Sequence, residues 1–203
     1  MKQSRRNVVA SALSFPLLTL AALHAPVLAD QSEEGVICSL TKPIFNLPHD
    51  GAHKDAHSEA HQAVNWIMAE VGLSPNFTVG HADFDQKVGA YAVISKRQRR
   101  IVYDTAYFTW VKGSPNWRET GIMAHEIGHH LAGHTAGIRT TSHAQELEAD
   151  RFAGFALGRL GATLSQATRW TQDLSEEGSR SHPPRRLRLI AASDGWRHGA
   201  SAK

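Results

Sequence analysis

The sequence has only one cysteine, Cys38, among its 203 residues. One thiol cannot form a disulfide bond within the chain, so packing has to stabilise the fold, with a bound metal as a second available contribution. Cys38 does not fit a lipid-attachment site, because Ile37, and not a small residue, directly precedes it. A free thiol and a disulfide bond to another chain both remain open.

Long apolar runs are also missing. The most apolar segment, residues 1–29, is interrupted by Pro16, His24 and Pro26 and is too short to span a bilayer. It starts with basic residues and ends in Val27-Leu28-Ala29, which fits a signal-peptidase cleavage site. We therefore predict a signal peptide over residues 1–29, with no stable membrane insertion after its removal. The predicted location is the periplasm, or the exterior, of a bacterium.

Two export routes remain open for this signal. Ser4-Arg5-Arg6 resembles the address of the twin-arginine pathway, which exports proteins already folded and often loaded with a cofactor. The same arginines also fit the ordinary basic start of a general secretory signal.

Acidic residues are absent from residues 1–29, which contain three of the chain's 22 Lys and Arg residues. Removal of the signal would leave 19 basic residues against 19 acidic ones, so the sequence pI of about 9.2 does not indicate a nucleic-acid partner. The one dense basic run, KRQRR at 96–100, has no interleaved aromatic residues and is interpreted as a solvated turn. No nucleic-acid partner is therefore predicted.

The remainder of the chain shows no internal repeat and no long linker. We divide it into an irregular lead-in at 30–53, one domain at 54–195 and a C-terminal tail at 196–203. Apolar residues at helical spacing predict a helix over about 53–71, stopped by Gly72. Alternating segments predict three strands at 76–83, 87–95 and 99–105, of which the last two form a hairpin. Helices are predicted after them at about 117–134 and 143–160, with shorter helical stretches to about 193. This order predicts an α+β domain.

Four histidines, at positions 49, 53, 57 and 61, recur every four residues within the first predicted helix. On a helix this spacing makes a stripe that could hold a metal ion. Asp55 and Glu59 lie in the same polar segment, and no buried carboxylate accompanies the stripe. We interpret it as a solvated helix face.

The sequence HEIGH at 125–129 is the strongest functional signal. His125 and His129 lie one helical turn apart, about 40° from each other, so both rings can reach one ion. Glu126 falls about 60° from His129, close enough to act on a ligand of that ion without binding the ion itself. This is the H-E-x-x-H arrangement, in which the histidines bind zinc and the glutamate acts as a general base. His130 and His134, about 140° and 180° from His125, are poor ligand candidates, and His134 is interpreted as a packed or capping residue.

A catalytic zinc site needs a third protein ligand. The continuation H-x-x-G-x-x-H is missing, because Ala132 and Thr135 stand three and six residues after His129. A glutamate on another helix is the alternative, and Glu146 in the predicted helix at 143–160 fits this role. Asp150, one turn later, fits an acceptor for the far ring nitrogen of a ligating histidine. Glu148 points about 200° from Glu146 and is assigned to solvent.

Three segments, HEIGH at 125–129, ELEAD at 146–150 and SHPPRRLR at 181–188, resemble the signatures of the CAAX-prenyl-protease and HtpX-like zinc metalloendopeptidases. The resemblance covers roughly residues 54–195. It implies a zincin-like (gluzincin) fold, with a small β-sheet and an active-site helix that carries H-E-x-x-H. It also implies one Zn²⁺ per chain at His125, His129 and Glu146, with Glu126 as the general base. His182 is expected above the metal, and Arg188 is expected to have a structural, charge-pairing role.

Two departures from the family pattern bear on the substrate. No transmembrane helix is predicted after the signal, so the soluble periplasmic members are the nearer comparison. Where the family usually has an Asn-Ala-Phe-Ala-like strand, this chain has Gly89-Ala90-Tyr91-Ala92. An extended substrate is still expected to pair with an edge strand near residues 87–94.

These observations predict an exported zinc metalloendopeptidase that hydrolyses peptide bonds of protein or peptide substrates, with periplasmic quality control as one interpretation of its role. The first alternative is a non-catalytic, zinc-stabilised chaperone or assembly module that uses the same groove. Glu126 disfavours it, because a structural site does not need a base beside an open coordination position. The second alternative, a histidine-rich metal buffer, predicts several weak sites instead of one tight site. The sequence predicts no oligomeric state.

Overall fold

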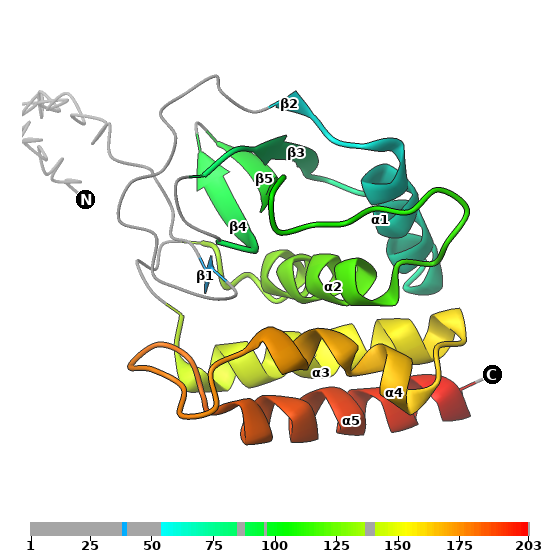
Figure 1. Cartoon of the computed structure of the whole chain (residues 1–203), viewed down its shortest axis with the longest axis vertical. Coiled ribbons are helices and arrows are strands. Elements are labelled where there is room, and N and C mark those ends of the chain that lie inside the picture. Colours follow the sequence, from blue (N-terminus) through cyan, green and yellow to red (C-terminus); the bar gives the residue numbers. More distant parts are fainter. Residues whose placement is uncertain (1–37, 40–53, 85–87, 96, 137–140, 203) are drawn as a thin grey trace, which may run out of the picture. The chain divides into compact units, whose positions relative to one another are not determined.

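The computed structural model describes residues 38–39, 54–84, 88–95, 97–136 and 141–202, and the predicted signal peptide lies outside them. The elements run in the order shown in Figure 1, with strands and α1 first and the other helices after them. The predicted α+β class is confirmed. None of the helices in these ranges is long and apolar enough to cross a membrane.

The predicted hairpin forms from β4 (Ala90–Ser95) and β5 (Gln98–Asp104). Ser95 pairs with Gln98, and residues 98–100 of the basic run form the start of β5. Arg97 takes the left-handed conformation, with φ +63°, that tight hairpin turns require. The predicted strand at 76–83 is β3 (Thr78–Ala82), which pairs with β5 in parallel.

Two short strands that the sequence did not predict complete a five-stranded sheet in the order β1-β4-β5-β3-β2. The pair Cys38–Ser39 forms β1, which is antiparallel to β4, and Lys54–Asp55 forms β2, which is antiparallel to β3. β1 pairs with Tyr91 and Ala92. The expectation of an open edge near residues 87–94 is therefore wrong at these two residues, because β4 already has a neighbouring strand on both sides.

The first helix, α1 (Ser58–Glu70), begins later than predicted because β2 occupies Lys54 and Asp55. His57 is its N-terminal capping position, and its backbone N–H donates to the Tyr103 hydroxyl group at 3.0 Å. The expected stripe is thus not one helix face: of its members only His61 lies within α1, and positions 49 and 53 lie outside the described residues.

Alternation along β5 separates two apolar clusters. Ile101 and Tyr103 belong to the main core with residues of α1, α2 and α3, whereas Val102 belongs to a smaller cluster that also contains Tyr91 and Val93. The sheet and α1 lie on one side of α2 (Trp117–Leu131), and α3 (His143–Leu160) and α5 (Arg185–Ser201) lie on the other, as Figure 1 shows. α2 is consequently the central, buried helix.

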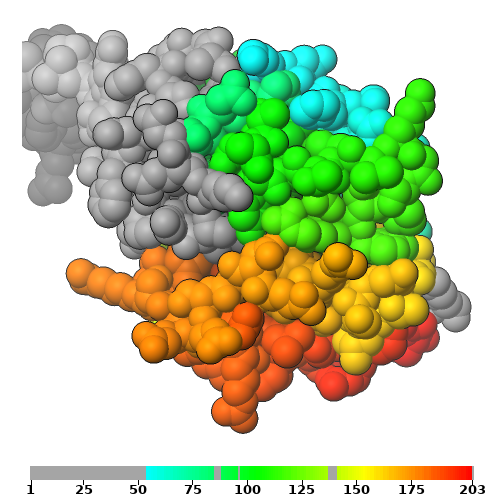
Figure 2. Space-filling model, in the orientation of Figure 1, coloured from blue at the N-terminus to red at the C-terminus, as the bar shows by residue number. Residues whose placement is uncertain are grey.

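Helices α3 and α5 pack at very short range because glycines face each other across their contact. A Cβ atom added to Gly154 would overlap the carbonyl oxygen of Ala192, and one added to Gly195 would overlap that of Arg151. α5 continues to Ser201, so the helix that packs on α3 extends into the predicted C-terminal tail at 196–203. The short helix α4 (Leu164–Ala167) and the 3-10 helix η1 (Arg169–Asp173) connect α3 towards α5. On the face shown in Figure 2, these yellow and orange segments close against the green segments around α2.

Candidate metal centre

Two packed helices position the candidate ligands. His125 and His129 lie one turn apart on α2, and Glu146 lies in the first turn of α3, where the positive end of the helix dipole favours a carboxylate. Ser142 fixes the start of α3 through a capping box with Gln145. Gly128 lets the helices approach closely, because a Cβ atom there would lie only 3.1 Å from the Cα atom of Ala149.

The three expected ligand side chains converge. The Nε2 atoms of His125 and His129 are 3.0 Å apart, and the Glu146 carboxylate oxygens lie 3.4 Å from the first and 3.6 Å from the second. All three side chains are fully buried. One ligand atom from each residue lies within 4.8 Å of the other two, and this is the only such group among the described residues. The group could therefore hold a metal ion.

The charges at the site also fit a cation. Glu126, Glu146 and Asp150 are fully buried carboxyl groups, and Arg188 is the only Lys or Arg side chain among the described residues that forms ion pairs with members of this set. Burial opposes ionisation of Glu146, but His125, His129 and Arg188 hold the pKa of its carboxyl group well below the usual range. Burial likewise opposes protonation of His125, yet Asp150 and Glu146 raise its pKa to about 9. A bound dication could replace that proton and balance the carboxylates.

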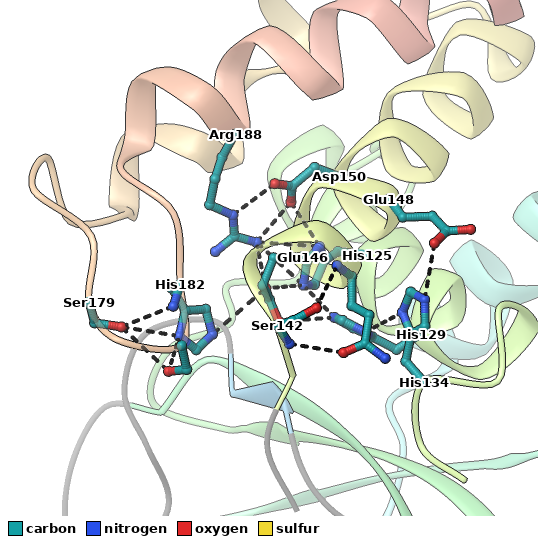
Figure 3. Close-up of polar contacts among 12 residues, drawn as sticks. His125, His129, His134, Ser142, Glu146, Glu148, Asp150, Ser179, His182 and Arg188 are labelled. Carbon is teal, nitrogen blue, oxygen red and sulfur yellow. Dashed lines mark hydrogen bonds and ion pairs between the residues drawn. The ribbon is translucent and has the colours of Figure 1, made fainter. Parts of the chain in front are cut away.

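Asp150 lies at the Nδ1 side of His125, whereas Nη2 of Arg188 lies 3.3 Å from Nε2 and 3.4 Å from Nδ1 of the same ring. The Asp150 Oδ1 atom lies 2.9 Å from His125 Nδ1, so the ring can donate through Nδ1 while Nε2 faces Glu146. Arg188 donates from Nε and Nη2 to the two Asp150 carboxylate oxygens, each at 2.8 Å. The structure thus brings Asp150 to the far nitrogen of a candidate ligand, with Arg188 paired to it (Figure 3).

Glu126 is completely buried, and neither of its carboxylate oxygens has a hydrogen-bond partner among the described residues. Burial raises the pKa of this carboxyl group to about 8, and His125 opposes the shift. The backbone of Ala92 lowers this pKa. This effect places β4 beside the Glu126 carboxyl group. A buried carboxyl group without a protein partner is costly, so a functional ligand is its natural partner.

His182 enters the site from the loop before α5. Its Nε2 atom lies 3.7 Å from Glu146 Oε2, and its Nδ1 atom lies 2.8 Å from the Ser181 hydroxyl oxygen. Burial lowers the pKa of His182, which favours the neutral ring. If the Ser181 hydroxyl group donates to Nδ1, the Nε2–H group of the neutral ring faces the ligand group.

His130 is a structural residue that faces the sheet. Its Nε2 atom lies 2.9 Å from the Arg100 carbonyl oxygen, its Nδ1 atom lies 3.2 Å from the Thr135 hydroxyl oxygen, and Phe77 stacks on its ring. These contacts hold its ring away from the candidate ligands, as its helical position predicts.

His134 is buried and Glu148 is largely exposed, as predicted, but helical geometry did not predict the contact between them. α2 ends at Leu131, so the direction expected for His134 on a continuing helix does not apply. The Nδ1 atom of His134 instead lies 3.0 Å from Nδ1 of His129, and its Nε2 atom lies 3.2 Å from Glu148 Oε2. Glu148 is 62% exposed but not free in solvent. The sequence signal that could have located this contact is Gly133, which ends the helix and reverses the chain.

Comparisons with known proteins leave the site to be interpreted from its own chemistry. No protein-family model matches the chain, and neither the search of curated proteins nor that of solved structures found a match.

Proposed function

We propose that this chain is a zinc-dependent metalloendopeptidase with a zincin-like fold, and that it acts on protein substrates after export. The observation that carries the proposal is the position of Glu126. Its buried carboxyl group has no hydrogen-bond partner among the described residues, and it follows His125 directly in a helix where His125, His129 and Glu146 converge. A purely structural zinc site is closed by a fourth protein ligand, and it does not need a buried carboxyl group that is not itself a ligand.

The donor set supports zinc. Two imidazole nitrogens and one carboxylate oxygen form the ligand set of catalytic zinc sites that leave a coordination position open. The resemblance of HEIGH, ELEAD and SHPPRRLR to the CAAX-prenyl-protease and HtpX-like family supports the same assignment. One ion per chain is expected, held by His125, His129 and Glu146.

The chain's own residues then supply acid-base chemistry. A zinc ion bound here would polarise the scissile carbonyl group and make water more acidic. Glu126 would accept the proton of the attacking water and pass it to the leaving nitrogen. Its raised pKa suits this second transfer, and a nearby cation would favour the ionised form needed for the first. His182 would donate a hydrogen bond from Nε2 to the oxygen that gains negative charge.

The decisive experiment compares wild type with Glu126→Gln, which keeps the size of the side chain but removes the base. The variant should retain one zinc per chain after dialysis and lose hydrolysis of casein. The control is Glu177→Gln, which removes an exposed carboxylate outside the ligand group and should retain hydrolysis. Casein cleavage by Glu126→Gln at the wild-type rate would contradict the role of the base. Zinc binding without cleavage by any form would favour the non-catalytic module.

Export is proposed from the residues of the predicted signal peptide. Replacing Arg5 and Arg6 by lysines should leave the precursor in the cytoplasm if the twin-arginine route is used. Export at the wild-type level would favour the general secretory route. Retention of full-length wild-type protein in the cytoplasm would contradict export itself.

A further inference from the structure

The chain reverses at the end of α2 and places His134 against His129. Gly133 takes φ +74°, and the backbone N–H of His134 donates to the carbonyl oxygen of His129 at 2.9 Å. This pattern is a Schellman motif, which stops the helix and folds the next residue against its last turn. The His134 ring thereby comes to lie beside the His129 ring, with their Nδ1 atoms 3.0 Å apart (Figure 3).

The two nitrogens of His129 have different surroundings. Nε2 faces His125 and Glu146, which form the ligand group, whereas Nδ1 faces His134. A ligating nitrogen must offer a lone pair, so the hydrogen of a neutral His129 has to be on Nδ1. That hydrogen can be donated only if Nδ1 of His134 is an acceptor.

Glu148 favours that arrangement. Its Oε2 atom lies 3.2 Å from His134 Nε2, and a carboxylate accepts but does not donate. The hydrogen of neutral His134 is therefore favoured on Nε2, which leaves Nδ1 as the acceptor for His129. His134 is only 6% exposed, so little water competes for these bonds.

We propose that His134 is a positioning residue for the metal site: it accepts a hydrogen bond from Nδ1 of His129, and Glu148 holds His134 in the orientation that allows this. This inference rests on the proposed function, since it assumes that His129 binds the metal through Nε2. His129 would then match His125, whose Nδ1 atom faces Asp150. Each ligand histidine has an acceptor behind it, one a buried carboxylate and the other a histidine linked to an exposed carboxylate.

The rival interpretation is that His134 is itself a metal ligand. A second ion between the Nδ1 atoms of His129 and His134 would need a third donor. Glu148 approaches Nε2, which is the other nitrogen of His134. Among the residues that the structure describes, no group of three ligand atoms includes His134. The geometry therefore assigns His134 to the support of a ligand.

The test measures the dissociation constant for Zn²⁺, by competition with a chelator, for the wild type and three variants. His134→Ala removes the acceptor and should weaken zinc binding by about 10- to 100-fold, the usual effect of losing such a partner. His134→Asn places an amide oxygen near the position of Nδ1 and should recover most of the affinity. His130→Gln, which changes the neighbouring buried histidine outside the ligand group, should bind zinc like the wild type.

Nuclear magnetic resonance supplies a readout that a loss of packing would not mimic. Long-range proton–nitrogen spectra of the zinc-loaded wild type should show the hydrogen of His134 on Nε2, which leaves its Nδ1 atom as the acceptor for His129. A hydrogen on Nδ1 of His134 would contradict the positioning role. Circular dichroism before each titration identifies a variant that fails to fold. If one does, the His134 tautomer in the zinc-loaded wild type tests the positioning role by itself.

The outcomes separate this inference from the proposed function. If the wild type binds one zinc and His134→Ala binds it equally tightly, the positioning role is wrong and the proposed site stands. Two zinc ions per wild-type chain, falling to one in His134→Ala, would make His134 a ligand. If the wild type binds no zinc, both the proposed function and this inference fail.

Discussion

Arg188 on α5 binds Asp150 on α3 through two parallel hydrogen bonds, from Nε to Oδ2 and from Nη2 to Oδ1, each 2.8 Å long. Both side chains are buried, and Asp150 also lies 2.9 Å from the Nδ1 atom of His125. A second Arg–Asp pair joins the same two helices at the surface, between Arg151 and Asp194. The surface pair is exposed and joined by a single hydrogen bond, so it serves as the control for the buried pair.

Arg188→Met should lower the unfolding free energy of the metal-free protein by about 3 kcal/mol, because it removes the arginine that pairs with the buried carboxylates of Asp150 and Glu146. Arg151→Met should cost less than about 1 kcal/mol, since water already solvates both partners of the surface pair. Urea unfolding in the presence of a chelator measures both values. Equal losses in the two variants would show that the buried pair has no special role.

Gly195→Ala should destabilise the protein although alanine favours helices by about 1 kcal/mol over glycine. The added Cβ atom would overlap the carbonyl oxygen of Arg151, so α5 would have to move away from α3. We expect a net loss of about 1 to 3 kcal/mol, measured by urea unfolding. Arg197→Ala, at an exposed position of α5, is the control and should change stability by less than about 0.5 kcal/mol. A more stable Gly195→Ala protein would refute the close contact.

His182→Ala should reduce turnover of a peptide substrate by about 100- to 1,000-fold while zinc stays bound, the scale of losing one donor to a developing oxyanion. The reason is that the Nε2 atom of His182 faces the ligand group but is not needed to complete it. Steady-state kinetics and zinc content should be measured on the same preparations. A rise in activity would instead identify His182 as an inhibitory fourth ligand, and an unchanged rate would remove it from the mechanism.

Zinc should raise the thermal midpoint of the wild type and leave that of Glu146→Ala almost unchanged. At a free zinc concentration 100 times the dissociation constant, binding to the folded state alone contributes about 2.7 kcal/mol. For a domain of this size we expect a shift of roughly 5 to 10 °C. Differential scanning calorimetry with zinc and with a chelator tests this, and a similar shift in Glu146→Ala would exclude Glu146 as a ligand.

The sequence predicted the elements whose patterns are local. Periodicity predicted the strands β3, β4 and β5, including the β4–β5 hairpin. It also predicted the helices α2 and α3, and α3 has the predicted bounds. The candidate ligands could also be identified, because a one-turn spacing fixes the direction of two side chains within a single helix. Glu146 required the further step of expecting a second helix beside the first.

Only the tertiary structure decided the contacts between segments that are distant in sequence. The strands β1 and β2 are two residues each, too short for any periodicity, and they form because β4 and β3 offer partners. The parallel pairing of β3 with β5 has the same non-local origin. β2 in turn delays the start of α1, so His57 lies before the helix and His61 within it.

The contact between His134 and His129 likewise depends on both the local sequence and the tertiary structure. The residue types and their spacing are visible in the sequence, but their direction depends on where α2 ends. Gly133 reverses the chain there, and α3 brings Glu148 to the other side of the His134 ring. Local patterns fix side-chain directions only within one continuous element, so the sequence determined which groups could bind a metal. The packing of α2 against α3, and of α3 against α5, decided which groups lie behind these ligands.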